Sequence, residues 1–232
     1  MSRSRIWLDV PYPDKDEAKT LGAWWDPDAR RWYAPRPGMS GLDRWRALPP
    51  VPDLLPGEDR DFGSGLFVDL VPSSCWFTNV RSCVSQRDWD RLRKMITTRA
   101  DRRCEICHRA EDRESGRWLE AHERWEFDHQ TKVQVLRRLI CLCTSCHTAT
   151  HYGLAKLTGK DGEAFSHICR VTRLSPRQVK DQIDLAYAVW QIRSLGIWEL
   201  DLGILLNAGV TLNRPPASGE RLNVAAAILR AL

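Results

Sequence analysis

The sequence predicts an α+β protein in which a small β-α-β unit precedes a linker, a cysteine-rich core and a helical extension. Three patterns support this prediction: strand and helix signals close together near the N-terminus, two Cys-x2-Cys pairs around an alternating segment, and long helical periodicity towards the C-terminus. The expected boundaries are 1–36 for the small unit, 37–65 for the linker, 66–155 for the core domain and 156–232 for the extension.

Composition narrows the class of protein. The chain has 232 residues, of which 43% are hydrophobic, so it can bury the core of one or two domains. No segment approaches the roughly 20 apolar residues of a membrane span, and the first residues lack the apolar run of a secretory signal. We therefore expect a cytoplasmic protein with no membrane partner. In that reducing compartment, Cys-x2-Cys pairs indicate metal binding more often than disulfides.

The N-terminal unit is expected from three short signals. Residues 6–10 alternate as a strand, and Asp14 with Glu17 forms a capping-box pattern that opens a helix ending at Gly22. Residues 24–33 have the pattern of an aromatic hairpin. Its tryptophans could stack on nucleic-acid bases, or they could form the core of so small a unit.

This segment resembles a small accessory domain of unknown function that is attached to plasmid primases and other mobile-element proteins. The resemblance rests on Leu8-x-Val10-Pro11, Lys15-x-Glu17-Ala18-Lys19-x-Leu21-Gly22-Ala23, Trp25-Asp26 and Trp32-Tyr33. It implies a module that travels with DNA-handling proteins, without implying a particular chemistry.

The segment after this unit is rich in proline, glycine and aspartate, which predicts a linker. A strand is expected over 66–70, and Ser85 with Asp88 predicts the start of a helix that continues to Ala100. Tyr152-Gly153 is expected to end a helix. Further helices are expected over 155–173, 176–195 and 223–232.

The cysteine spacing is the most specific signal in the chain. Cys104-x2-Cys107 and Cys143-x2-Cys146 supply four thiolates, which is the ligand set of a tetrahedral structural Zn²⁺. Such a zinc would stabilise a motif too small to bury its own core. The alternative is four reduced, buried cysteines at coincidental spacing.

Three histidines predict a second metal site. His147 directly follows the second cysteine pair and His151 lies one helical turn further, so both imidazoles share one face of a helix. Alternation over 118–128 predicts a hairpin strand that carries His122 towards that helix. A divalent ion held there (Mg²⁺, Mn²⁺ or Zn²⁺) would keep positions open for water and a phosphate oxygen. The alternative is that the two helix histidines hold no ion.

The stretch 104–151 resembles the HNH endonucleases that carry a four-cysteine zinc in a ββα-metal core. In that family the segment reads Cys-x2-Cys, then Leu-Glu-x-(Asp or His)-His, then Asn-Leu-x-x-Leu-Cys-x2-Cys-His. The resemblance places His122 and His147 on metal-ligand positions, and His151 on a further ligand position that some members use.

Two residues depart from the family pattern. Glu123 stands at the position of the general-base histidine, and Arg138 stands where an asparagine usually orients that base. A glutamate can serve as a general base when burial raises its pKa, so Glu123 is the first candidate. His129, in the pair Asp128-His129, is the second candidate, although it lies closer to the second cysteine pair than the family spacing.

Basic residues lead into the first cysteine pair. Between Arg81 and Arg109 they outnumber the acids by about two to one, which suits contact with a phosphate backbone. The alternative is a solvated helix face. The residues expected to bind nucleic acid are Arg91, Arg93, Lys94, Arg99, Arg102, Arg103, Arg124 and Arg138.

Together these signals favour a metal-dependent DNA endonuclease or nickase, with His122 in the catalytic centre beside one of the two candidate bases. RNA is an alternative partner, and a homodimer is compatible with the pattern. One alternative function is a zinc-dependent nucleic-acid-binding protein that has lost catalysis. Another is a zinc-stabilised interaction module of a mobile element or defence system.

Overall fold

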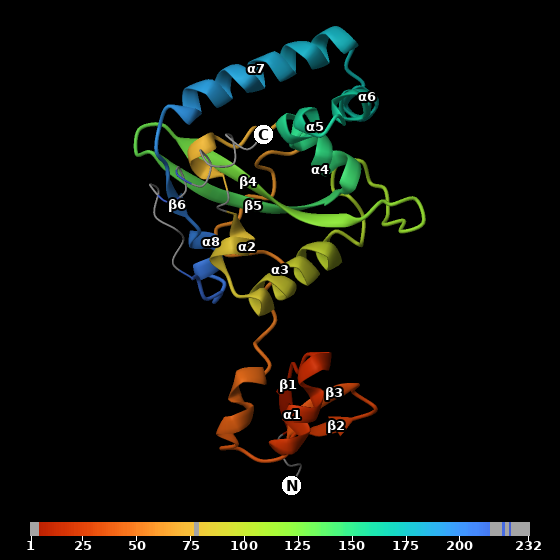
Figure 1. Ribbon diagram of the computed structural model, residues 1–232, viewed down its shortest axis with the longest axis vertical. Coiled ribbons are helices and arrows are strands. Elements are labelled where there is room, and N and C mark those ends of the chain that lie inside the picture. The colour runs from red at the N-terminus through yellow and green to blue at the C-terminus, as the bar shows by residue number, and fades with distance from the viewer. Residues whose placement is uncertain (1–4, 77–78, 214–219, 221–222, 224–232) are drawn as a thin grey trace. The chain divides into compact units, whose positions relative to one another are not determined.

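The computed structural model of the protein describes residues 5–76, 79–213, 220 and 223. It has the expected α+β composition, and the chain divides into two compact units, Met1–Pro50 and Val51–Leu232 (Figure 1). The boundary between the units falls inside the segment expected as a linker.

The first unit is a three-stranded antiparallel sheet with short helices. The strand order is β1-β3-β2. Its elements are β1 (Ile6–Leu8), η1 (Tyr12–Asp14), α1 (Lys15–Thr20), β2 (Trp24–Asp26), β3 (Arg31–Ala34) and η2 (Ser40–Trp45).

Two details of this unit differ from expectation. The Asp14 side chain does not cap α1, because its Oδ2 atom accepts a hydrogen bond from the indole Nε1 of Trp45 at 2.9 Å. Leu42 and Trp45 are both buried in the core of this unit. Part of the expected linker therefore folds back and completes the first unit.

The second unit is built around a long β-hairpin. β6 lies parallel to β5 and gives the strand order β4-β5-β6. The elements of this unit are η3 (Ser73–Cys75), α2 (Val80–Cys83), α3 (Gln86–Arg99), β4 (Leu119–Asp128), β5 (Val133–Cys143), α4 (Thr144–Thr150), α5 (Tyr152–Leu157), α6 (Asp161–Thr172), α7 (Pro176–Ser194), β6 (Glu199–Asp201) and α8 (Gly203–Leu206).

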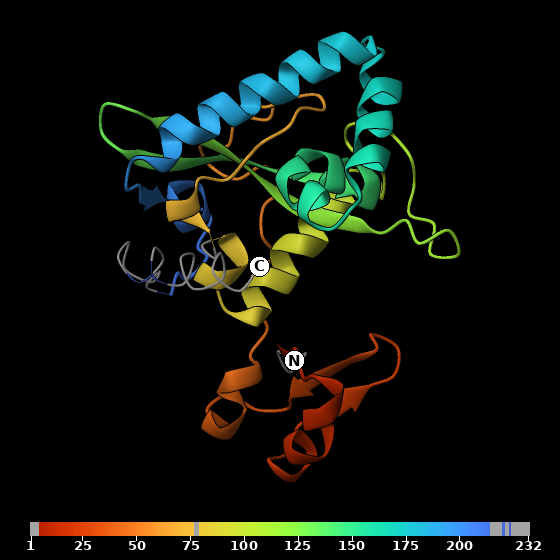
Figure 2. The ribbon, with the colours of Figure 1, turned by 45° about the horizontal axis from the view of Figure 1, so that its top comes forward.

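The hairpin separates two hydrophobic cores. Leu139 and Cys141 of β5 pack with α2, α3 and α8. Ile140 and Leu142 point to the other face and pack with α4, α5, α6 and α7. Figures 1 and 2 show α3 on one side of the hairpin and the α4–α7 helices on the other. This alternation follows from the two-residue period of a strand, and it decides which side chains can meet.

Residues 51–70 cover the hairpin without forming a strand. Leu55 is fully buried in the α3 core, so this part of the expected linker belongs to the second unit. The strand expected over 66–70 is absent from the described structure, although the N–H of Asp69 bonds to the carbonyl of Thr150 at 2.9 Å. Buried leucines and individual hydrogen bonds, such as that from the N–H of Asp59 to the carbonyl of Arg137 at 3.0 Å, hold this segment in place without a strand ladder.

The helix boundaries follow the capping signals in part. The side chain of Ser85 accepts a hydrogen bond from the N–H of Asp88, as expected, and Ser175 with Gln178 forms a complete capping box at α7. The helix that carries His147 ends at Thr150, just before Tyr152-Gly153, so the expected break is confirmed. Gly153 itself lies in α5, where an added Cβ would come within 3.1 Å of Leu70. The side chain of Leu70 would have to shift slightly to admit a larger residue there.

The expected C-terminal helix, 223–232, lies outside the described residues beyond Asn223. Within the described part of the chain, no helix is both long enough and apolar enough to cross a membrane.

Candidate metal centres

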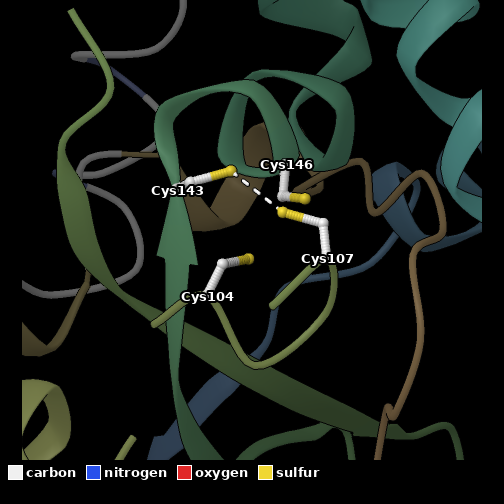
Figure 3. Close-up of side chains that lie close together, drawn as sticks. All are labelled: Cys104, Cys107, Cys143 and Cys146. Atoms are coloured by element: carbon white, nitrogen blue, oxygen red, sulfur yellow. Dashed lines mark hydrogen bonds between the residues drawn. The ribbon is translucent and has the colours of Figure 1, made fainter. Parts of the chain in front are cut away.

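Four cysteines from three segments converge at one end of the hairpin (Figure 3). Cys104 and Cys107 come from the turn before β4, Cys143 is the last residue of β5, and Cys146 lies in the first turn of α4. Their sulfur atoms lie within 4.8 Å of one another, and the Sγ atoms of Cys107 and Cys143 are 3.6 Å apart. This cluster could hold a metal ion.

The first cysteine pair sits in a tight turn closed by backbone hydrogen bonds. The N–H of Cys104 bonds to the carbonyl of Arg109, and the N–H of His108 bonds to the carbonyl of Cys104, each at 2.9 Å. His108 adopts a left-handed conformation with φ of 59°, which reverses the chain directly after the second sulfur. The turn therefore aims both thiols at the same point.

The protonation of the four sulfurs is coupled. Hydrogen bonds from Cys143 and Cys146 lower the pKa of the Cys104 thiol. The contact with Cys104 and burial raise the pKa of Cys143 to about 12 and raise that of Cys146 further. Four thiolates so close together repel one another unless a cation lies between them, so the cluster fits a divalent metal.

A histidine absent from our sequence-based site lies beside this cluster. The Nε2 atom of His167, on α6, is 3.1 Å from the Sγ of Cys146, and its Nδ1 is 3.1 Å from a guanidinium nitrogen of Arg170. His167 is buried. A partner of this kind orients a metal ligand and tunes its charge.

A second cluster is formed by His122 of β4, His147 of α4 and His151, which directly follows α4. The centres of the three rings are separated by 4.7 to 5.2 Å. The ring nitrogens that could bind an ion lie within 4.8 Å of one another. His122 is buried, and its Nε2 atom has no hydrogen-bond partner. An ion could satisfy this otherwise orphaned nitrogen.

The environment keeps these imidazoles neutral, which is the form that binds a metal. Burial, then His151 and then Arg124, hold the pKa of His122 well below its usual value. Burial and the neighbouring His147 lower the pKa of His151 to about 3. The pKa of His147 is also lowered by burial, against an opposing effect of Glu120.

Glu120 supplies an orienting contact to the second cluster. Its Oε2 atom lies 3.2 Å from Nδ1 of His147. A carboxylate in that position favours the tautomer that carries hydrogen on Nδ1, so Nε2 keeps its lone pair. The sequence contained a signal for this residue, because Glu120 lies two positions before His122 and shares its strand face.

Comparison with known proteins bears on the first unit of the chain. Residues 5–46 match the family model described as a domain of unknown function (DUF5710). One protein named DNA primase TraC, from Escherichia coli, is 41% identical over 56 residues, which are 24% of this chain and 5% of that primase. A second of the same name and organism is 56% identical over 31 residues, 13% of this chain and 2% of that primase. The chain thus matches only a small part of these relatives.

No solved structure gives a significant match. The expected resemblance of the N-terminal segment to a primase-associated domain of unknown function is confirmed. The resemblance of 104–151 to HNH nucleases stays a prediction from the sequence.

Glu123 does not join the histidines, contrary to its expected role as a base. It follows His122 on β4 and therefore points to the opposite face of the hairpin. There its Oε1 atom accepts a hydrogen bond from the N–H of Val80, the first residue of α2, at 2.9 Å. The carboxylate caps a helix instead of facing the candidate metal centre.

His129 also lies away from the cluster. It sits in the turn between β4 and β5, at the other end of the hairpin from the cysteines, and its ring packs edge-on against Trp198 with 5.1 Å between the ring centres. The second candidate base therefore contacts Trp198, the residue before β6, and not His147.

The basic residues of α3 lie on the other face of the hairpin from the histidines. Arg99 is withdrawn from the surface by paired hydrogen bonds to Glu58, each of 2.7 Å. Arg91 is mostly buried and paired with Asp88. Arg93 and Lys94 of α3 remain exposed, as do Arg102 and Arg103, which follow this helix.

Arg124 and Arg138 are neighbours across the hairpin, and both are buried. Arg138 forms a salt bridge with Glu105, whose Oε2 atom lies 2.6 Å from Nη2 of Arg138. Its guanidinium therefore has a structural role and is not available to bind nucleic acid as expected. Arg124 shares the face of His122, and its charge lowers the pKa of all three histidines of the cluster. Its Nε and Nη1 atoms have no hydrogen-bond partner.

Proposed function

We propose that the protein is a metal-dependent endonuclease or nickase of the HNH type that acts on DNA, with RNA as the alternative substrate. The observation that carries this proposal is the convergence of three imidazoles between β4 and α4, next to a four-cysteine cluster. A strand, a second strand and a helix in that order are the frame implied by the resemblance to HNH nucleases. The similarity of the first unit to primase segments supports a role in DNA handling.

The donor sets suggest which ions bind. Four thiolates favour a structural Zn²⁺. Three neutral imidazoles favour Zn²⁺ or another transition ion over Mg²⁺, which prefers oxygen ligands. When bound at the histidines, such an ion supplies Lewis-acid chemistry, lowering the pKa of water and stabilising charge on a phosphate oxygen. The protein contributes orientation of His147 by Glu120 and positive charge from Arg124.

A second candidate function is a nucleic-acid-binding protein without catalysis. It is favoured by the use of the family's base position, Glu123, as a helix cap and by the pairing of Arg138 with Glu105. The residue at the position of the general base and the residue at the position that orients it both make structural contacts instead.

Cleavage of supercoiled plasmid separates the two functions. The assay compares wild type, His147→Ala and His129→Ala in the presence of Zn²⁺, Mn²⁺, Ni²⁺ or Mg²⁺. We expect nicking that His147→Ala abolishes and His129→Ala preserves, because only His147 belongs to the cluster. Circular dichroism and zinc content verify that the fold and the cysteine site are retained.

Two results would count against this proposal. Loss of nicking in His129→Ala with His147→Ala still active would retain the nuclease but move its catalytic centre from the histidine cluster to the hairpin turn. Absence of nicking with every ion, together with DNA binding that weakens steeply with salt, would instead establish the binding protein.

A further inference from the structure

One face of the N-terminal sheet carries a row of three aromatic rings. Trp7 of β1 and Trp24 of β2 both lie directly opposite Tyr33 of the central strand β3. The ring centres of Trp7 and Tyr33 are 6.0 Å apart, and those of Trp24 and Tyr33 are 6.3 Å apart. The row therefore crosses all three strands.

These rings are not required for the core of the unit. The core is built on the opposite face, where Leu8 and Ala34 pack with Ala18 of α1 and Trp45 of η2. None of the three rings of the row belongs to that buried cluster, and Trp24 is 60% exposed. The sheet thus presents flat aromatic surface that its own folding does not use.

Two arginines flank the row. The guanidinium of Arg5 lies 5.1 Å from the ring centre of Tyr33, and that of Arg31 lies 5.4 Å from the ring centre of Trp7. Both side chains are about half exposed, although Arg5 pairs with Asp26 and Arg31 with Asp9. A guanidinium has five N–H groups in a planar fork, so one carboxylate leaves donors for a phosphate.

We propose that this face binds single-stranded nucleic acid. Unpaired bases would stack on the exposed ring of Trp24 and continue along the row, while Arg5 and Arg31 contact the backbone phosphates. A duplex hides its base faces within its own stack and cannot use such a row. An apolar protein partner would bury the rings but would gain little from two cations. This site lies in the first unit and is independent of the histidine cluster.

The test is fluorescence anisotropy of a labelled oligothymidylate with the full-length chain. Trp24→Ala removes the most exposed ring of the row, and we expect the affinity to fall about 5- to 150-fold, the range for loss of one stacked base. Trp24→Phe keeps a stacking surface and should restore most of the affinity. Trp25→Ala is the matched control, because Trp25 is also exposed but its side chain points to the other face of the same strand.

The arginines are tested through the salt dependence of binding. Arg31→Ala should reduce the slope of log affinity against log salt by about 0.7, the value for one phosphate contact on a single strand. Arg44→Ala is the control, since Arg44 lies over Trp45, on the core side of the unit.

Oligouridylate and a duplex of equal length complete the experiment. Trp24→Ala should weaken the binding of the single strands and leave the binding of the duplex unchanged, and the single strand that loses more affinity identifies the preferred sugar. The proposal is overturned if Trp24→Ala weakens the binding of the duplex as much as that of the single strands, or if Trp24→Ala and Trp25→Ala bind the single strand equally well. Neither result would alter the nuclease proposal, whose residues lie in the second unit.

Discussion

The carboxylate of Glu120 contacts the imidazole of His147, with 3.2 Å between Oε2 and Nδ1. Glu120 comes from β4 and His147 from the helix that follows β5, so the contact ties the two elements that carry the histidine cluster. This contact makes Glu120 a positioning residue for the proposed metal site.

Replacing Glu120 should weaken metal binding at the histidines. We expect Glu120→Ala to lower the affinity for Zn²⁺ at this site by about 10- to 100-fold, the usual effect of losing a carboxylate that orients a metal-ligating histidine. Calorimetric titration of protein that already carries the cysteine-bound ion would measure it. Glu126→Ala on the same strand is the control, because Glu126 pairs with Arg137 and not with a histidine. An equal loss of Zn²⁺ affinity in both variants would show that Glu120 does not position His147.

Glu123 should prove to be a structural residue. Glu123→Ala leaves the N–H of Val80 without its acceptor, and we expect a loss of about 1–3 kcal/mol in the free energy of unfolding. Glu123→Gln keeps an acceptor and should lose less. Urea denaturation gives both values. In the plasmid assay, Glu123→Gln should nick like wild type; an inactive but folded variant would return Glu123 to the role of general base.

Removing one sulfur should disrupt the proposed zinc site. We expect Cys107→Ser to lose the structural ion and to lower the melting temperature, because metal binding there contributes directly to folding. Cys169→Ser is the matched control, since Cys169 is also half-buried but lies outside the cluster. Elemental analysis and thermal melts report the two effects. Full zinc content in Cys107→Ser would contradict the four-cysteine assignment.

The buried pair of Arg99 and Glu58 should contribute strongly to stability. Arg99→Met leaves the Glu58 carboxylate buried without its partner, and such a loss typically costs about 3–5 kcal/mol. The side chains of both residues are almost fully buried. Arg93→Met, an exposed position on the same helix, should cost little. Chemical denaturation of the two variants at neutral pH measures the difference.

The contribution of this pair should depend on pH. Burial alone would raise the pKa of Glu58, but hydrogen bonds from Arg99 and from the N–H of Leu139 outweigh burial and lower it below 4.5. Stability from Glu58 is therefore present above pH 4.5, the value for the unfolded chain, and is lost as the pH falls through the lower folded value. Removing Arg99 takes away the main contact that opposes burial, so the cost of Arg99→Met should shrink as the pH falls and be smallest below the folded pKa of Glu58 in the wild type. A cost independent of pH would contradict this account.

Local sequence patterns predicted much of the candidate site. The Cys-x2-Cys pairs and the i, i+4 histidines have fixed spacing, so the chain itself brings these side chains together. The caps at Ser85 and Ser175 are equally local and were predicted correctly. Strand alternation also placed His122 towards the helix.

What the sequence did not predict depends on contacts between distant segments. Position-by-position comparison with a family placed Glu123 beside the metal, although the two-residue strand period puts it on the other face. Arg99 was expected to bind nucleic acid, because its ion-pair partner, Glu58, lies 41 residues away along the chain and cannot be recognised from local sequence. Proline- and glycine-rich composition indicated a linker over 37–65, whereas burial of Leu42 and Leu55 attaches its two halves to different units.

The position of Cys143 implies an order of metal uptake. This residue ends β5 and is also the N-cap of α4, which has only 7 residues. Isolated helices shorter than about 12–15 residues are unstable in water, so α4 depends on being anchored at its start. We expect an ion at the cysteines to fix this helix first and a second ion to enter afterwards, between imidazoles that the first has aligned. Occupancy of the cysteine site would then determine whether the proposed histidine site can fill.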